Sequence, residues 1–160
     1  MNPDKDQTII NLLQSEWELL QAAISTLKLS IWKCQSIGIK ESYTFEELES
    51  FDSLTSKFNR TSDIFTQKVL RSVWLLLHEP FVPFIDMINK SEKMLMLRSA
   101  DQIIEIRDLR NQLAHEYIPE AIRDLVPEVI ELTFQLFENI EDCRCFLESR
   151  NWIQKNKTYS

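Results

Sequence analysis

Residues 99–118 read SADQIIEIRDLRNQLAHEYI and contain neither glycine nor proline. Five aliphatic side chains recur there at helical spacing: Ile103, Ile104, Ile106, Leu109 and Leu113. This spacing predicts one helix over the whole stretch, including the octet Arg-Asn-Gln-Leu-Ala-His-Glu-Tyr at residues 110–117. A helix with such an apolar side needs other helices to cover it, so the stretch points to a helical bundle.

The rest of the chain has the same character. Its 160 residues include one glycine and five prolines, which leaves little material for hairpin turns. Apolar periodicity predicts helices at residues 4–37, 45–78, 84–96, 100–118 and 122–152. We therefore expect a single domain over residues 1–160, all-α, built as a four-to-five-helix up-down bundle with mostly antiparallel neighbours.

Several residues mark the expected helix ends. Gly38 is suited to the position just after the first helix. Thr44 and Ser99 are candidate N-caps of the second helix and of the octet helix. For the last helix we expect Asp124 as a cap, with Pro127 in the first turn.

Arg110 is unusual for its place in the octet helix. At about 100° per residue it falls between Ile103, Ile106 and Leu113 on the apolar side. His115 lies about 140° round the same helix, so the two could border one cleft but cannot face each other within one helix. One interpretation is structural, with Arg110 in a buried ion pair and His115 a satisfied side chain.

The other interpretation is chemical. A guanidinium holds phosphate oxygens in a planar fork and stays charged at any relevant pH. An imidazole titrates near neutrality, so it can take a proton from a ribose 2′-hydroxyl or give one to a leaving oxygen. The pair therefore suits phosphodiester cleavage in RNA, with no metal or other cofactor required.

The octet resembles the R-x4-H-x-Y signature of HepT-type toxins in the HEPN superfamily (higher eukaryotes and prokaryotes nucleotide-binding). Residues 51–63 are also similar to the second helix of the longer members. This resemblance implies a HEPN-like bundle that forms homodimers and acts as a metal-independent ribonuclease toxin. Transfer RNA is then the first expected substrate class, and no DNA substrate is expected.

The resemblance also implies a role for each octet residue. Arg110 would bind the scissile phosphate, Asn111 would hold the helix and substrate geometry, and His115 would transfer protons. Tyr117 would accept AMP from a minimal nucleotidyltransferase antitoxin. The alternative is a non-catalytic nucleotide-binding HEPN protein that serves as the substrate-binding partner of a nucleotidyltransferase. A third possibility is an adaptor dimer in which Arg110 only pairs with a buried carboxylate.

A polar row follows the second expected helix, at Ser56, Arg60, Asp63, Gln67 and Arg71. Such a row is ordinarily a solvated surface with weak ion pairs. If it instead borders the Arg110 cleft, Arg60 or Arg71 could bind phosphate. Asp63 could then orient Arg110 or His115.

The remaining features limit the possible functions. A net charge of −7 disfavours a protein that coats nucleic acid, although a local basic cleft could still bind phosphate. The three cysteines, Cys34, Cys143 and Cys145, have no disulfide-framework or metal-site spacing, which favours a reduced, cytoplasmic protein. We expect no secretory signal and no membrane span. His78, the only other histidine, is expected to be structural.

Overall fold

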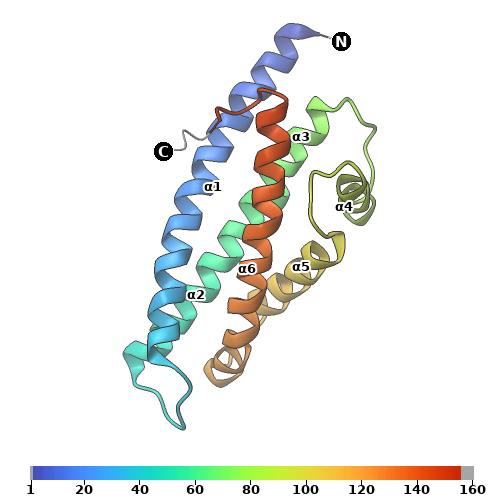
Figure 1. The fold of residues 1–160 in the computed structure, drawn as a ribbon. Helices are drawn as coiled ribbons and strands as arrows, with labels where there is room; N and C mark the ends of the chain where they lie inside the picture. The colour runs from blue at the N-terminus through green and yellow to red at the C-terminus, as the bar shows by residue number, and fades with distance from the viewer. Residues whose placement is uncertain (1, 156–160) are drawn as a thin grey trace.

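The computed structural model describes residues 2–155, and these residues form helices joined by short links (Figure 1). The elements in chain order are α1 (Pro3–Ile37), α2 (Phe45–Asp63), the π-helical segment η1 (Ile64–Val69), α3 (Leu70–Leu76), α4 (Phe84–Lys93), α5 (Ala100–Ala114) and α6 (Pro119–Ser149). The predicted all-α bundle is therefore confirmed for the described part of the chain. The chain runs without a break through α2, η1 and α3, which together form one long helix.

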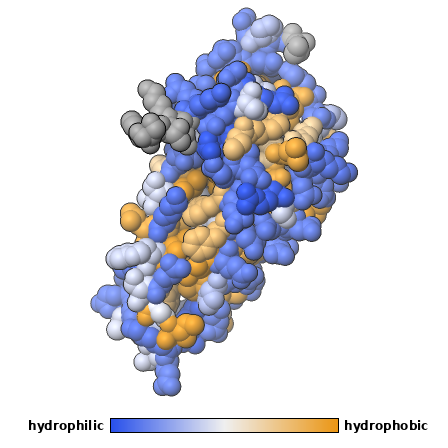
Figure 2. Space-filling model, in the orientation of Figure 1, coloured by the Kyte–Doolittle hydropathy of each residue, from blue (hydrophilic) through white to orange (hydrophobic). Residues whose placement is uncertain are grey.

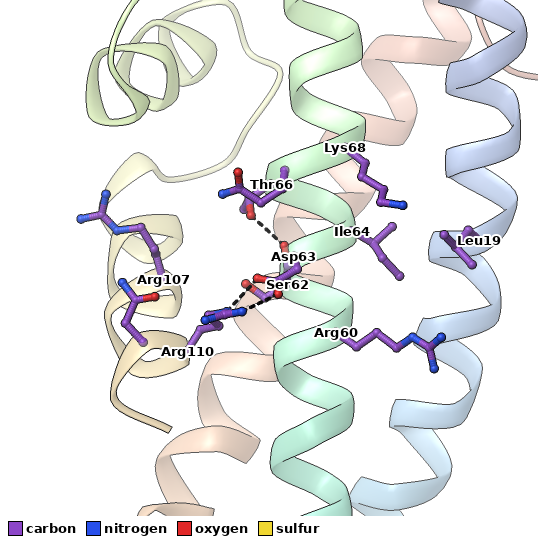
Figure 3. Close-up of a pocket in the computed structure, with 11 residues that line it drawn as sticks. Leu19, Arg60, Ser62, Asp63, Ile64, Thr66, Lys68, Arg107 and Arg110 are labelled. Carbon is purple, nitrogen blue, oxygen red and sulfur yellow. Dashed lines mark hydrogen bonds and ion pairs between the residues drawn. The ribbon is translucent and has the colours of Figure 1, made fainter. Parts of the chain in front are cut away.

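This long helix is the centre of the molecule. It runs antiparallel to α1 and lies between α1 and α5, while α6 packs along another side of it (Figures 1 and 3). Phe58 and Phe65, both fully buried, anchor it in a core shared with Leu20, Ile103 and Leu136 from α1, α5 and α6. The side of α2 and η1 between α1 and α5 is where the candidate site lies.

Three of the predicted helix ends are confirmed. Gly38 follows α1 with φ 73°, a conformation that favours glycine. Thr44 forms a capping box with Glu47, in which each side chain accepts the other residue's backbone N–H. The Ser99 side chain accepts the N–H of Gln102 at the start of α5.

The octet is only partly helical, contrary to the prediction. α5 ends at Ala114, and the carboxylate of Glu116 accepts the N–H groups of Tyr117 and Ile118, both at 3.1 Å. These bonds satisfy donors that a continuing helix would have used. The last three residues of the octet therefore belong to a short link.

The last helix begins earlier than predicted. Pro119 occupies its first position, where a missing N–H costs nothing, and Ile118 before it is extended, as a residue before proline prefers. Asp124 is therefore inside α6 and does not cap it, and Pro127 lies beyond the first turn.

The predicted second and third helices also end sooner than expected. α3 ends at Leu76, so His78 lies in the following turn, with φ 56°. The His78 imidazole contacts Asp6 of α1, with Nε2 and Oδ2 3.0 Å apart, a contact that ties this turn to the start of the chain. α4 ends at Lys93, three residues before the predicted limit.

A buried amide secures the start of α5 against α6. The Asn139 oxygen accepts the N–H groups of Arg98 and Ser99, and its nitrogen donates to the side chain of Gln102 and the carbonyl of Gln135. Asn139 is completely buried, and these four bonds use its full capacity. The amide therefore fixes where the octet helix begins.

No helix within residues 2–155 combines the length and apolarity that crossing a bilayer requires. Cys34 and Cys143 are buried, Cys145 is exposed, and all three are unpaired. Burial raises the pKa of the Cys143 thiol far above its usual range, which keeps it in the unreactive thiol form.

Candidate functional site

Arg110 of α5 is joined to Asp63, the last residue of α2. Its Nε donates to Oδ1 at 2.8 Å and its Nη2 donates to Oδ2 at 2.7 Å. The side chain of Arg110 is 32% exposed and that of Asp63 is 39% exposed. This is therefore not the fully buried ion pair that a purely structural role predicts. A guanidinium has five N–H donors, and three of those of Arg110 remain for a ligand.

The ion pair fixes the charge state of the arginine. The hydrogen bonds to Asp63 raise the pKa of Arg110, and partial burial opposes this only in part. Arg110 is thus a permanent cation whose plane is set by a carboxylate. For groups farther away, the negative charge of Asp63 cancels most of the positive charge of Arg110. Other cations nearby would therefore strengthen the binding of a phosphate.

Arg110 borders a cleft of about 830 Å³ (Figure 3). The residues that line it are Leu19, Arg60, Ser62, Asp63, Ile64, Thr66, Gln67, Lys68, Arg107, Arg110 and Asn111. α2 and η1 form its floor, with α1 on one side and α5 on the other. Four cations and one carboxylate in this lining give the cleft a positive charge in a chain whose net charge is −7.

The π-helical segment η1 contributes to the lining of the cleft. The N–H of Leu70 donates to the carbonyl of Phe65, five residues earlier, and the Thr66 hydroxyl donates to the carbonyl of Ser62 at 2.8 Å. A π-helical stretch changes the direction of every later side chain relative to a regular α-helix, and such stretches are frequent at functional sites.

The structure divides the predicted polar row. Arg60, Asp63 and Gln67 line the cleft, whereas Ser56 and Arg71 are not part of its lining. The guanidinium of Arg71 instead donates to the side chain of Gln67, with bonds of 3.3 and 3.1 Å. Of the two arginines predicted as possible phosphate ligands, the geometry therefore favours Arg60.

The octet residues do not gather at one place. Asn111 lines the cleft beside Arg110, but His115, exposed at the C-terminal end of α5, is not part of the lining. The imidazole of His115 has no hydrogen bond or ion pair with any residue in 2–155. Within one chain, Arg110 and His115 therefore face different surroundings, as their angular separation on the helix predicts.

Tyr117 borders a second, smaller groove. Its side chain is 85% exposed, and it lies with Phe45, Leu48, Pro119 and Ile122 around a hollow of about 420 Å³. The hollow is mostly apolar and carries acidic side chains from α2 and from Glu116. The phenol is therefore open to another macromolecule but is not in the Arg110 cleft.

Compared with family models, with curated proteins and with solved structures, the chain matches none. The likeness to HepT-type proteins therefore rests on the octet and on residues 51–63.

Two cations of the cleft were not singled out from the sequence. Lys68 lies within η1, whose changed geometry no residue pattern signalled. Arg107 precedes the octet by one helical turn, and its guanidinium lies over the ring of Phe84, 5.0 Å from the ring centre, beside Asp108. Among residues 2–155, no group of three or more His, Cys, Asp or Glu side chains is arranged to hold a metal ion.

Proposed function

We propose that the protein is a metal-independent ribonuclease of the HepT type, in which Arg110 binds the phosphate of the bond that is cut. The observation that carries this proposal is the bidentate Asp63–Arg110 pair at the edge of a cationic cleft. An arginine with a fixed plane and three unused donors is suited to the charge that grows on a phosphoryl group during transfer.

The reaction follows from the groups available. A ribose 2′-hydroxyl attacks the adjacent phosphorus as the His115 imidazole removes its proton, and the 5′-oxygen leaves with a proton taken from water. The products are a 2′,3′-cyclic phosphate and a free 5′-hydroxyl. The His115 imidazolium then gives its proton to the hydroxide left from that water, so each turnover ends in the starting protonation state and consumes neither an oxidant nor a metal.

The separation of His115 from the Arg110 cleft supports a site shared by two copies. A two-fold axis can bring His115 of one chain to Arg110 of the other, and both composite sites then form together. Figure 2 shows apolar side chains exposed in a strip along one face. Large exposed apolar residues include Leu29 and Trp32 on α1 and Phe134 on α6, and such side chains favour association.

The proposal gives Tyr117 a regulatory role as the acceptor of AMP from a minimal nucleotidyltransferase antitoxin. Its support is the exposed phenol in the link after α5. Tyr117 is two residues from His115, so an added phosphate would place negative charge and bulk beside the proton-transfer group. In a shared site, the same addition would also obstruct the cleft of the other chain.

The direct test is expression of the protein in cells, with growth and small-RNA integrity measured together and transfer RNA examined first. Wild type should arrest growth and cut RNA, whereas Arg110→Ala and His115→Ala should do neither. Arg71→Ala, a cation on the same long helix but outside the cleft lining, is the control and should behave as wild type. Cleavage that survives both octet substitutions contradicts the proposal.

The role of Tyr117 has its own readout. Co-expression with the nucleotidyltransferase should add about 329 Da per AMP to the intact mass, as expected for covalent adenylylation. Tyr117→Phe should keep the nuclease activity, lose the mass shift and escape inhibition. A mass shift that persists in Tyr117→Phe assigns the acceptor to another residue.

One observation favours a second candidate function, a non-catalytic nucleotide-binding partner of a nucleotidyltransferase. Within a single chain the cleft contains the cation but not the imidazole. Calorimetry with AMP and ATP separates the two candidates, since a binder should hold nucleotide through Arg110 and leave RNA intact. Under this alternative, His115→Ala changes neither property.

A further inference from the structure

Four cations line the Arg110 cleft, and they lie on two sides of the central helix. In Figure 3, Arg110 lies on the side of α2 and η1 that faces α5, whereas Arg60 and Lys68 extend on the side that faces α1. We propose that Arg60 and Lys68 bind a second backbone phosphate, so that the cleft accepts an RNA strand lying across α2 and η1 and not a mononucleotide alone. This inference rests on the proposed function and identifies the form of its substrate.

Arg60 is the clearest part of this second site. Its side chain is exposed, and its guanidinium makes no hydrogen bond or ion pair with any other residue in the described range 2–155. A guanidinium at the edge of a cleft, with all five donors unused, is a suitable partner for a phosphate with two accessible oxygens.

Lys68 reinforces Arg60 from the next turns of the same helix. It is exposed, and its positive charge opposes, in small part, the effect of burial that raises the pKa of Glu16 on α1. Glu16 is 8% exposed, and its carboxylate accepts a hydrogen bond from Ser72 inside the bundle. The Lys68 ammonium therefore remains available on the solvent side as a point charge for a phosphate.

The two cations on the α5 side are already engaged. Asp63 cancels much of the Arg110 charge, and Arg107 is held over Phe84 and beside Asp108. Most of the uncompensated positive charge in the cleft therefore lies on the α1 side, across the helix from the arginine proposed to hold the scissile phosphate. A ligand with a single phosphate can use only one of these sides, whereas a strand can use both.

The test compares a strand with a single phosphate on the full-length protein. The strand is a fluorescent oligouridylate with 2′-O-methyl riboses, which cannot be cut because its 2′-oxygens carry no proton to remove. Binding is followed by anisotropy over a series of salt concentrations, and AMP binding is measured by calorimetry. The variants are Arg60→Gln and Lys68→Gln, with Arg71→Gln as the matched control.

Arg60→Gln and Lys68→Gln should each weaken oligonucleotide binding several-fold. Each should also reduce the slope of log affinity against log salt by about 0.7, the value for one lost contact with a single strand. AMP binding should not change, and Arg71→Gln should match wild type in both assays. The inference is overturned if both cleft variants bind the strand as wild type does, or if they lose AMP as strongly as the strand.

RNA cleavage by the same proteins separates this inference from the proposed function. If wild type binds the strand through Arg60 and Lys68 but cuts no RNA, the ribonuclease proposal fails and the second phosphate site stands. If Arg110→Ala abolishes cleavage while Arg60→Gln and Lys68→Gln neither bind nor cut less well than wild type, the ribonuclease stands and the second site is wrong.

Discussion

Arg110 and Asp63 lie 47 positions apart in the sequence and meet through two nearly parallel hydrogen bonds of 2.8 and 2.7 Å. Paired bonds of this kind fix the plane of the guanidinium as well as its position. Because Asp63 is the last residue of α2, the contact also ties the end of that helix to the C-terminal part of α5. Asp63 is therefore a positioning residue for the cation that we propose binds phosphate.

We predict that Asp63→Asn lowers RNA cleavage strongly and stability only slightly. The amide nitrogen would face Nη2, so one of the two bonds becomes a contact between donors. Since both side chains are partly exposed, the loss of stability should be about 1 kcal/mol. Urea unfolding and cleavage rates measure the two effects.

The matched control is Asp108→Asn, which removes an exposed carboxylate from the looser contact with Arg107 at 3.4 Å. It should change neither property. Full cleavage activity in Asp63→Asn would remove the positioning role.

The sequence predicted the bundle well because helix ends depend on nearby residues. Gly38, Thr44 and Ser99 each act within a few positions of their own place in the chain, and all three occupy the predicted ends. The ends that differ involve interactions that compete with helix formation. Glu116, for example, binds the backbone of the following link instead of continuing α5.

The candidate site was only partly predictable. The octet identified Arg110, and the polar row raised Asp63 as its possible partner, but helical spacing could not choose between Arg60 and Arg71. That choice depends on the tertiary structure, which places Arg60 but not Arg71 in the lining of the cleft, beside the π-helical segment η1. No local residue signal marked this segment, and so Lys68 was missed.

Asn139 provides a test of the packing that fixes the start of α5. We predict that Asn139→Asp destabilises the fold by about 2–4 kcal/mol, because the side chain loses its N–H donors and places a charged oxygen against acceptors in a fully buried position. Chemical unfolding gives the value. Glu131→Gln, an exposed change on the same helix, should have little effect, and equal stability of the two variants would contradict the role given to Asn139.

Glu16 should make stability depend on pH. Burial raises the pKa of this carboxyl, and the opposing effects of Ser72 and Lys68 are smaller. Between the ordinary and the raised pKa, the folded protein binds more protons than the unfolded chain. The contribution of Glu16 to the free energy of unfolding therefore decreases as pH rises through this window.

Glu16→Gln should remove that dependence, because a neutral amide keeps a hydrogen bond to Ser72 without a buried charge. The free energy of unfolding of the variant minus that of wild type should be larger at about pH 7.5 than at about pH 5. Urea unfolding at both pH values measures the difference, with the exposed neighbouring change Glu18→Gln as control. A difference that is the same at both pH values would contradict the prediction.

The position of His115 outside the Arg110 cleft leads to a mixing experiment. Arg110→Ala and His115→Ala should each be inactive alone. In a mixed dimer, the intact arginine of one chain meets the intact histidine of the other, so one of the two shared sites is complete. After random exchange of equal amounts, about half of the dimers are mixed, and each has one complete site of two. The mixture should therefore regain about a quarter of wild-type activity. If instead both groups of a site come from the same chain, no mixture restores cleavage, so an inactive mixture whose chains have exchanged would rule out the shared site.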